Sequence, residues 1–206
     1  MSDQKLIQPV LDAFVACGVQ DVFLKKAILA NMQKECGLIP KEENLNYSNT
    51  SNDRIRKIFG SRVSAITDDA LNVIKADPQK FAELVYGSGN AVGRSMGNVN
   101  PGDGWTYRGR GYIQLTGRAN YKFYGDITGF NLIANPELLV TDRTISAIVS
   151  VKFILVGLHG NVKFKDQESA NRAVTQVIGG KGLNLDKGYG AELLAKVNDY
   201  SNRYNL

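Results

Sequence analysis

Apolar residues recur at intervals of three and four along most of the chain, the spacing of one face of an α-helix. Asp77 and Pro78 supply a capping side chain and a first-turn proline, so one helix is expected to begin at Pro78. Gly18 and Gly37 fall where two helices should end. The pattern therefore predicts a mainly α-helical protein, with helices in residues 6–15, 22–35, 70–74, 81–86, 145–158, 170–178 and 191–200.

Two long stretches, residues 37–52 and 87–111, show no such periodicity. Loops of this length in a compact domain are usually functional or disordered. Their tyrosine, tryptophan, asparagine and glycine content favours ordered loops that line a ligand groove. The β structure expected is very short, one extended piece at residues 112–115. Without a visible linker or internal repeat, residues 1–206 are expected to form a single domain.

The composition is that of a globular protein, with 43% hydrophobic and 22% charged residues. No secretory signal pattern is visible at the start of the chain. The most apolar run, residues 145–160, is interrupted by Lys152 and His159 and is predicted to be a buried core helix rather than a membrane span. Two cysteines, Cys17 and Cys36, favour free thiols in a cytosolic setting, and a single histidine argues against a zinc site. The net charge of +5 suits an anionic partner.

The most informative stretch is residues 104–121, which combines glycines with arginines, aromatic residues, an amide and a hydroxyl. Aromatic faces stack on sugar C–H surfaces, whereas arginine, glutamine and asparagine hydrogen-bond to hydroxyl and N-acetyl groups. Glycines let the backbone turn sharply and approach a ligand closely. These residue types are typical of a carbohydrate-binding groove, and a structural glycine-rich turn is the alternative.

Together with residues 33–37, 43–48, 84–87 and 135–139, this stretch resembles the lysozyme-like branch of the family 19 glycoside hydrolases. That family contains plant-type chitinases and many bacteriophage endolysins. The resemblance runs roughly from Ile28 to Lys187. It implies a lysozyme-like helical fold with groove-lining loops, a single catalytic domain without a separate cell-wall-binding module, and no metal or organic cofactor.

Glu35 is the first catalytic candidate, because it ends an apolar stripe formed by Leu24, Ile28 and Met32 on the predicted 22–35 helix. Burial on that face disfavours the carboxylate anion, and the negative end of the helix dipole adds to the effect. A carboxylic acid that keeps its proton near neutral pH can protonate a glycosidic oxygen. We therefore expect Glu35 to be the general acid.

Glu43 is the expected general base, in a loop predicted to be more solvated than the helix end, so that its carboxylate is ionised at pH 7. Hydrolysis with inversion needs two carboxyl groups about 6.5–9.5 Å apart, with room for the attacking water. Glu42 is an adjacent competitor, and either could be a solvated loop charge. The place of Glu43 in the family motif favours it.

The resemblance also assigns roles in the groove. Thr116 matches the serine or threonine that orients the nucleophilic water, and Gln114 and Asn120 match positions that hold N-acetyl and hydroxyl groups. Further substrate contacts are expected from Tyr47, Tyr107, Arg110 and Tyr112, with Tyr86 and Trp105 as other possible subsite walls. The chain departs from the family pattern at Lys34, where a histidine is usual, at Cys36 and at Ile178.

The expected function is hydrolysis of β-1,4 links between N-acetylmuramic acid and N-acetylglucosamine in peptidoglycan, as by a bacteriophage endolysin that lyses its host. Such an enzyme would be made in the host cytoplasm and act as a monomer in the periplasm, on glycan strands and anionic envelope polymers, without membrane insertion or nucleic-acid binding. A chitinase, a non-catalytic glycan-binding protein and a basic nucleic-acid-binding protein are the alternatives.

Overall fold

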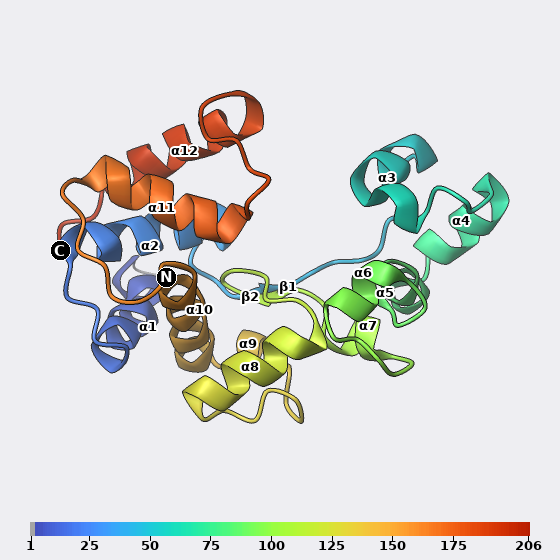
Figure 1. Cartoon of the computed structure of the whole chain (residues 1–206), viewed down its shortest axis with the longest axis horizontal. Coiled ribbons are helices and arrows are strands. Elements are labelled where there is room, and N and C mark those ends of the chain that lie inside the picture. Colours follow the sequence, from blue (N-terminus) through green and yellow to red (C-terminus); the bar gives the residue numbers. More distant parts are fainter. Residues whose placement is uncertain (1–2) are drawn as a thin grey trace. The chain divides into compact units, whose positions relative to one another are not determined.

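The computed structural model describes residues 3–206, and the chain is arranged in two units (Figure 1). The terminal unit comprises the chain up to Lys41, residues 111–113 and residues 138–206. The central unit comprises residues 42–110 and 114–137. The chain thus passes between the units more than once, and each unit is described by itself.

The terminal unit is built from helices α1 (Asp3–Ala16), α2 (Val22–Cys36), α9 (Leu138–Thr141), α10 (Arg143–Gly157), α11 (Gln167–Gly179) and α12 (Gly188–Ser201). Helix α2 packs against α11 and α12, and α10 packs against α1 (Figure 1). The predicted stripe of Leu24, Ile28 and Met32 is fully buried in the core of this unit. Gly37 ends α2 with a φ of 66°, a left-handed conformation that favours glycine.

The central unit contains α3 (Asn52–Phe59), the 3-10 helix η1 (Gly60–Arg62), α4 (Asp68–Lys75), α5 (Pro78–Tyr86), α6 (Ala91–Ser95), α7 (Asp103–Thr106) and α8 (Arg118–Thr128). Its core gathers Leu45, Ile55, Phe59, Leu71 and Phe81. Helices α5 and α7 pack closely, because the Glu83 carboxylate accepts hydrogen bonds from the backbone N–H groups of Gly102 and Trp105. This clasp fixes the loop that leads to the glycine-rich stretch.

The prediction of a mainly α-helical protein is confirmed, and Asp77 caps α5 with Pro78 in the first turn as expected. The two long stretches are less irregular than predicted: residues 87–111 contain α6 and α7. The expected extended piece at residues 112–115 is instead a turn that leads to a bridge between Leu115 and Arg110. The strands are β1 (Lys41–Glu42) and β2 (Arg110–Gly111), which pair with each other.

The apolar run at residues 145–160 forms α10, a core helix, and His159 lies just beyond its end with a φ of 62°. Within residues 3–206, no helix is both long enough and apolar enough to cross a membrane.

Candidate active site

Glu43 is held in the central unit by one backbone hydrogen bond and two hydrogen bonds to its carboxylate. The backbone N–H of Glu43 donates to the carbonyl of Gly109 at 2.8 Å, which continues the β1 pairing by one residue. The hydroxyl of Tyr86 donates to Glu43 Oε1 at 3.0 Å, and the N–H of Gly109 donates to Oε2 at 3.4 Å. A side chain bonded at both oxygens has a fixed orientation, as a general base requires.

The surroundings of Glu43 differ from the solvated loop predicted from the sequence. Burial raises the pKa of Glu43, and this effect outweighs the hydrogen bonds from Tyr86 and Gly109 and the charges of Arg62 and Arg108, which lower it. The expectation of an ordinary, solvated carboxylate is therefore wrong. A base whose pKa lies closer to neutral binds a proton more strongly, which suits proton removal from water.

Three predicted site residues converge on Gly109. A Cβ atom on this glycine would lie 3.1 Å from Gln114 Oε1 and 3.3 Å from both Glu43 Oε2 and Thr116 Oγ1. Gly109 therefore lies close to three oxygen atoms from two distant segments of the central unit. A carboxylate, a hydroxyl and an amide oxygen are thus gathered beside one glycine.

The turn that carries Gln114 and Thr116 is unusual in its backbone. Gln114 has a φ of 56°, a left-handed conformation that non-glycine residues rarely adopt and that often accompanies functional sites. The Thr116 hydroxyl donates to the Gln114 carbonyl at 2.8 Å, so the lone pairs of its oxygen remain to accept a hydrogen bond. The exposed Asn120 donates from Nδ2 to the Thr116 carbonyl at 2.8 Å.

Glu42 is engaged in a different cluster from its neighbour. Its Oε2 accepts from Arg108 at 2.5 Å and from Arg110 at 3.2 Å. Both arginines are buried, and Arg110 also donates to the Thr106 carbonyl and the Tyr121 hydroxyl. Successive residues of an extended chain point to opposite faces, so the Glu42 carboxylate forms ion pairs with the two arginines, whereas the Glu43 carboxylate faces Gly109.

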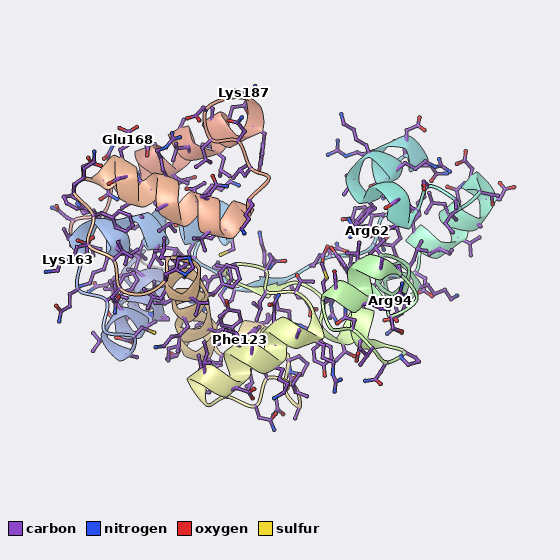
Figure 2. The ribbon with its side chains drawn as sticks, viewed as in Figure 1. Arg62, Arg94, Phe123, Lys163, Glu168 and Lys187 are labelled. Carbon is purple, nitrogen blue, oxygen red and sulfur yellow. The ribbon has the colours of Figure 1, made fainter. Side chains whose placement is uncertain are left out.

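An aromatic cluster borders Glu43. The Tyr47 ring lies 5.5 Å from Phe59 and 5.0 Å from Phe81, between ring centroids. The guanidinium of Arg62, labelled in Figure 2, lies 5.0 Å from the Phe59 ring and 5.7 Å from the Tyr86 ring. Burial, reinforced by the charge of Glu43, raises the pKa of both Tyr47 and Tyr86. Both hydroxyls therefore stay protonated and can donate hydrogen bonds at neutral pH.

Three residues predicted to contact substrate are instead buried. Tyr112 is 0% exposed and belongs to the core of the terminal unit, whereas Tyr107 and Arg110 are about 5% exposed in the central unit. The Tyr107 hydroxyl donates to the Ile133 carbonyl, and its ring packs on Tyr121. Their position differs from the groove surface expected from the sequence, because all three side chains are buried in the interior of their units.

Glu35 lies at the end of α2 in the terminal unit, with a side chain 29% exposed. Lys34 donates to Glu35 Oε1 at 3.0 Å and to the Tyr189 hydroxyl at 3.3 Å. Burial lowers the pKa of Lys34, but the hydrogen bond and charge of Glu35 outweigh it and raise the pKa overall. Adjacent positions of a helix point in different directions, but the long lysine side chain still reaches its neighbour.

Other reactive groups are poorly suited to chemistry. Cys17 and Cys36 are free thiols, and burial raises the pKa of Cys36 to about 11, so that its nucleophilic thiolate is scarce near neutral pH. Among residues 3–206, no cluster of three or more histidine, cysteine, aspartate or glutamate side chains could hold a metal ion.

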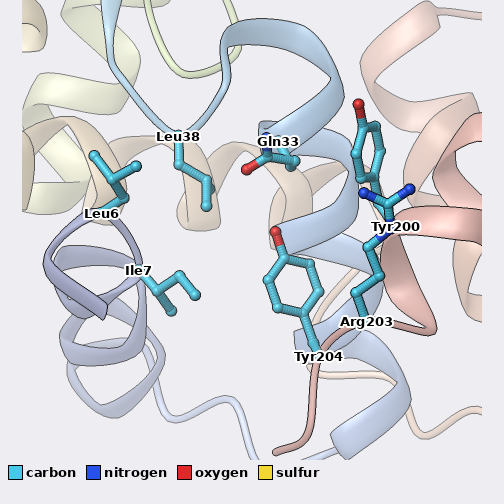
Figure 3. Close-up of a pocket in the computed structure, with 7 residues that line it drawn as sticks. All are labelled: Leu6, Ile7, Gln33, Leu38, Tyr200, Arg203 and Tyr204. Carbon is cyan, nitrogen blue, oxygen red and sulfur yellow. The ribbon is translucent and has the colours of Figure 1, made fainter. Parts of the chain in front are cut away.

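A hollow of about 290 Å³ lies elsewhere in the terminal unit (Figure 3). None of the catalytic candidates lines it; its walls are Leu6, Ile7, Gln33, Leu38, Tyr200, Arg203 and Tyr204. Gln33 and Glu35 are two positions apart on α2, so their side chains point to different faces of the helix. The hollow is therefore distinct from the surroundings of Glu35.

The mainly helical fold with its very short pair of strands is that of the lysozyme-like proteins. The family model of the class I chitinases matches residues 86–171, which include Tyr86, Gly109 and Thr116. A glycosyl hydrolase family 19 domain-containing protein of Haemophilus influenzae is 38% identical over 110 residues, 50% of this chain and 50% of that protein. The acidic 27 kDa endochitinase of Solanum lycopersicum is 30% identical over 110 residues, 46% of this chain and 44% of that protein.

Chitinase C from Streptomyces griseus has a similar fold: the TM-score is 0.51 with 19% sequence identity, over 96% of this chain and 68% of that chain. The chain spans about half the length of the curated relatives it matches. Residues 86–171 are therefore similar to the catalytic domain of the family 19 glycoside hydrolases.

Proposed function

We propose that the protein hydrolyses β-1,4 glycosidic links of peptidoglycan with inversion, with Glu35 as general acid, Glu43 as general base and Thr116 as the residue that positions water. The observation that carries the proposal is the convergence of Glu43, Thr116 and Gln114 on the side of Gly109 where a Cβ atom would lie. The engagement of Glu42 with two arginines supports Glu43 as the base of the adjacent pair.

The reaction requires two proton transfers: one carboxylic acid donates a proton to the glycosidic oxygen, and one carboxylate removes a proton from the attacking water. Glu35 donates its proton to the glycosidic oxygen as the bond to the anomeric carbon breaks. A water held by Thr116 attacks that carbon from the opposite face while Glu43 takes up its proton. The two carboxyl groups thus exchange protonation states, and proton exchange with solvent restores them for the next turnover.

Peptidoglycan as the substrate is supported by two features of the chain. The net charge of +5 favours an envelope rich in carboxylates and phosphates. The motifs resemble those of bacteriophage endolysins. We therefore propose a monomeric enzyme that reaches the cell wall from the host cytoplasm, degrades glycan strands and causes lysis.

The decisive experiment follows the loss of turbidity of purified sacculi with the wild-type protein, Glu35→Gln and Glu43→Gln. Each variant is expected to lose about 10³-fold in rate while it keeps its circular dichroism spectrum. Glu168→Gln, an exposed acid on α11 that is labelled in Figure 2, is the matched control and should retain full activity. Near-normal rates in Glu35→Gln would reject the assignment of the acid. The anomer of the fresh product, measured by NMR, tests inversion separately.

Chitinase activity is the second candidate, favoured by the match to the class I chitinases. Release of soluble oligomers from chitin, without sacculus lysis, would favour it. A non-catalytic glycan-binding protein is favoured by the ion pair of Lys34 with Glu35, since the candidate acid is already engaged by a neighbouring side chain. Glycan binding without product release from either polymer would support that third function.

A further inference from the structure

Tyr189 presents an exposed aromatic ring beside Glu35 in the terminal unit. It lies in the first turn of α12 and is 67% exposed, unlike most tyrosines of the chain. A ring so exposed contributes little apolar burial to the core. Exposed aromatic faces of this kind are suited to apolar C–H surfaces of a ligand.

The ring is tied to Glu35 through Lys34. Lys34 Nζ lies 5.6 Å from the Tyr189 ring centroid and donates to its hydroxyl at 3.3 Å. The same ammonium donates to Glu35 Oε1 at 3.0 Å, and the lysine side chain is only 17% exposed. One half-buried group therefore fixes the positions of both the exposed ring and the candidate acid.

The backbone of Tyr189 is also held in place. A Cβ atom on the following residue, Gly190, would lie 1.9 Å from the Asn184 carbonyl oxygen, so the first turn of α12 packs directly on the preceding loop. Lys187, labelled in Figure 2, occupies the N-cap position of the helix. The ring is thus exposed on a fixed backbone, which limits the conformational entropy lost on binding a ligand.

We infer that Tyr189 is a stacking platform for an N-acetylated pyranose ring of the glycan, held by Lys34 next to the sugar whose link Glu35 protonates. The inference rests on the proposed function and adds a substrate contact to it. The ammonium occupies one face of the ring, and the exposed remainder takes the C–H face of the sugar. Lys34 thereby positions both the ring of Tyr189 and the carboxylate of Glu35.

The test compares Tyr189→Ala and Tyr189→Phe in steady-state hydrolysis of solubilised peptidoglycan strands. Tyr189→Ala should raise KM about tenfold with kcat within about twofold, whereas Tyr189→Phe keeps the ring and should stay within about twofold of wild type in both. Phe123→Ala, which removes another exposed aromatic ring in the central unit (Figure 2), is the control and should leave KM unchanged. An unchanged KM in Tyr189→Ala, or an equal increase in Tyr189→Phe, would overturn the stacking role.

A second measurement separates this inference from the proposed reaction. Binding of N-acetylglucosamine tetramer and of intact sacculi is measured on the Glu35→Gln background, where no turnover is needed. Weaker binding on addition of Tyr189→Ala supports the platform even if the wild-type protein cleaves neither polymer. Equal binding with and without the tyrosine ring contradicts the platform even if wild-type hydrolysis is confirmed.

Discussion

The hydroxyl of Tyr86 donates a hydrogen bond to Oε1 of Glu43 at 3.0 Å, across 43 positions of the sequence. Burial raises the pKa of Glu43, and this hydrogen bond acts in the opposite direction. The tyrosine at the end of α5 thus adjusts the protonation of the candidate base. The sequence suggested Tyr86 as a subsite wall, and the structure adds this contact with the carboxylate.

Tyr86→Phe is expected to move the acid limb of the kcat/KM profile upward by about one pH unit. The variant loses a hydrogen bond to a charged group, so the ionised base forms only at higher pH. The profile is measured with sacculi between pH 4 and 9, with Tyr200→Phe on α12 as a control. A profile identical to that of the wild type would show that the hydroxyl does not tune Glu43.

Glu43→Gln is expected to stabilise the fold near neutral pH by about 1 kcal/mol, while it abolishes activity. The raised pKa of Glu43 means that the folded state resists ionisation more than the unfolded chain does. The resulting destabilisation of the wild type is absent below the unfolded-state pKa, appears as the pH rises past it, and is complete above the folded-state pKa.

Urea unfolding of wild type and Glu43→Gln at pH 3 and pH 7 measures this effect. The two stabilities should agree at pH 3 and differ at pH 7, with the variant more stable. A variant that is less stable than wild type at pH 7 would contradict the sign derived from burial.

Thr116→Val is expected to lower kcat about 10²-fold with little change in KM, because the variant loses the oxygen that positions water but not the bulk of the side chain. Thr116→Ser keeps the hydroxyl and should retain most of the rate. Single-turnover rates with solubilised glycan strands measure the difference. Similar rates for the valine and serine variants would exclude the water-positioning role.

Gly109→Ala tests whether the arrangement of side chains around this glycine matters for catalysis. The added methyl group would lie 3.1–3.3 Å from side-chain oxygens of Gln114, Glu43 and Thr116, and these groups must shift by a few tenths of an ångström. We expect at least tenfold lower kcat with a small change in melting temperature. Gly89→Ala is the matched control, since its Cβ meets no atom within 4 Å and should leave both quantities unchanged.

Glu42→Ala should mainly affect stability. It leaves the buried guanidinium groups of Arg108 and Arg110 without their carboxylate partner, at an expected cost of about 2 kcal/mol because Glu42 itself is partly exposed. Thermal unfolding gives the loss, and the specific activity of the folded fraction should exceed that of Glu43→Ala by a large factor. Equal inactivity of the two folded variants would reopen the choice of base.

Several elements could be predicted because the signals are local. The periodicity of apolar residues located α2 and α10, and Asp77 with Pro78 marked the start of α5. Helix α8 was missed because its buried face is formed by Tyr121, Tyr124 and Gly125 rather than by an aliphatic stripe. Helix α3 buries only Ile55 and Phe59 in eight residues, too few to establish a period.

The candidate site was less predictable because its environment depends on distant segments. Glu43 was expected to be solvated, since its sequence neighbours are charged and polar, but Tyr86 and Gly109 cover it. Conversely, Tyr112 lies in a stretch whose residue types are typical of a ligand groove, but its ring packs into the core of the terminal unit. The residue types indicated carbohydrate chemistry, but contacts between distant segments decided which of these side chains face solvent.

The pairing of β1 with β2 also constrains how this region can change. Because Glu42 and Glu43 point to opposite faces, a one-residue shift in register caused by loss of a residue between Gly37 and Lys41 would change both environments. Glu43 would then meet the arginines, and Asn44 would face Gly109. An insertion or deletion of one residue here would alter catalysis and folding together, whereas a change of two would preserve the alternation, so length variation among functional homologues should favour even steps.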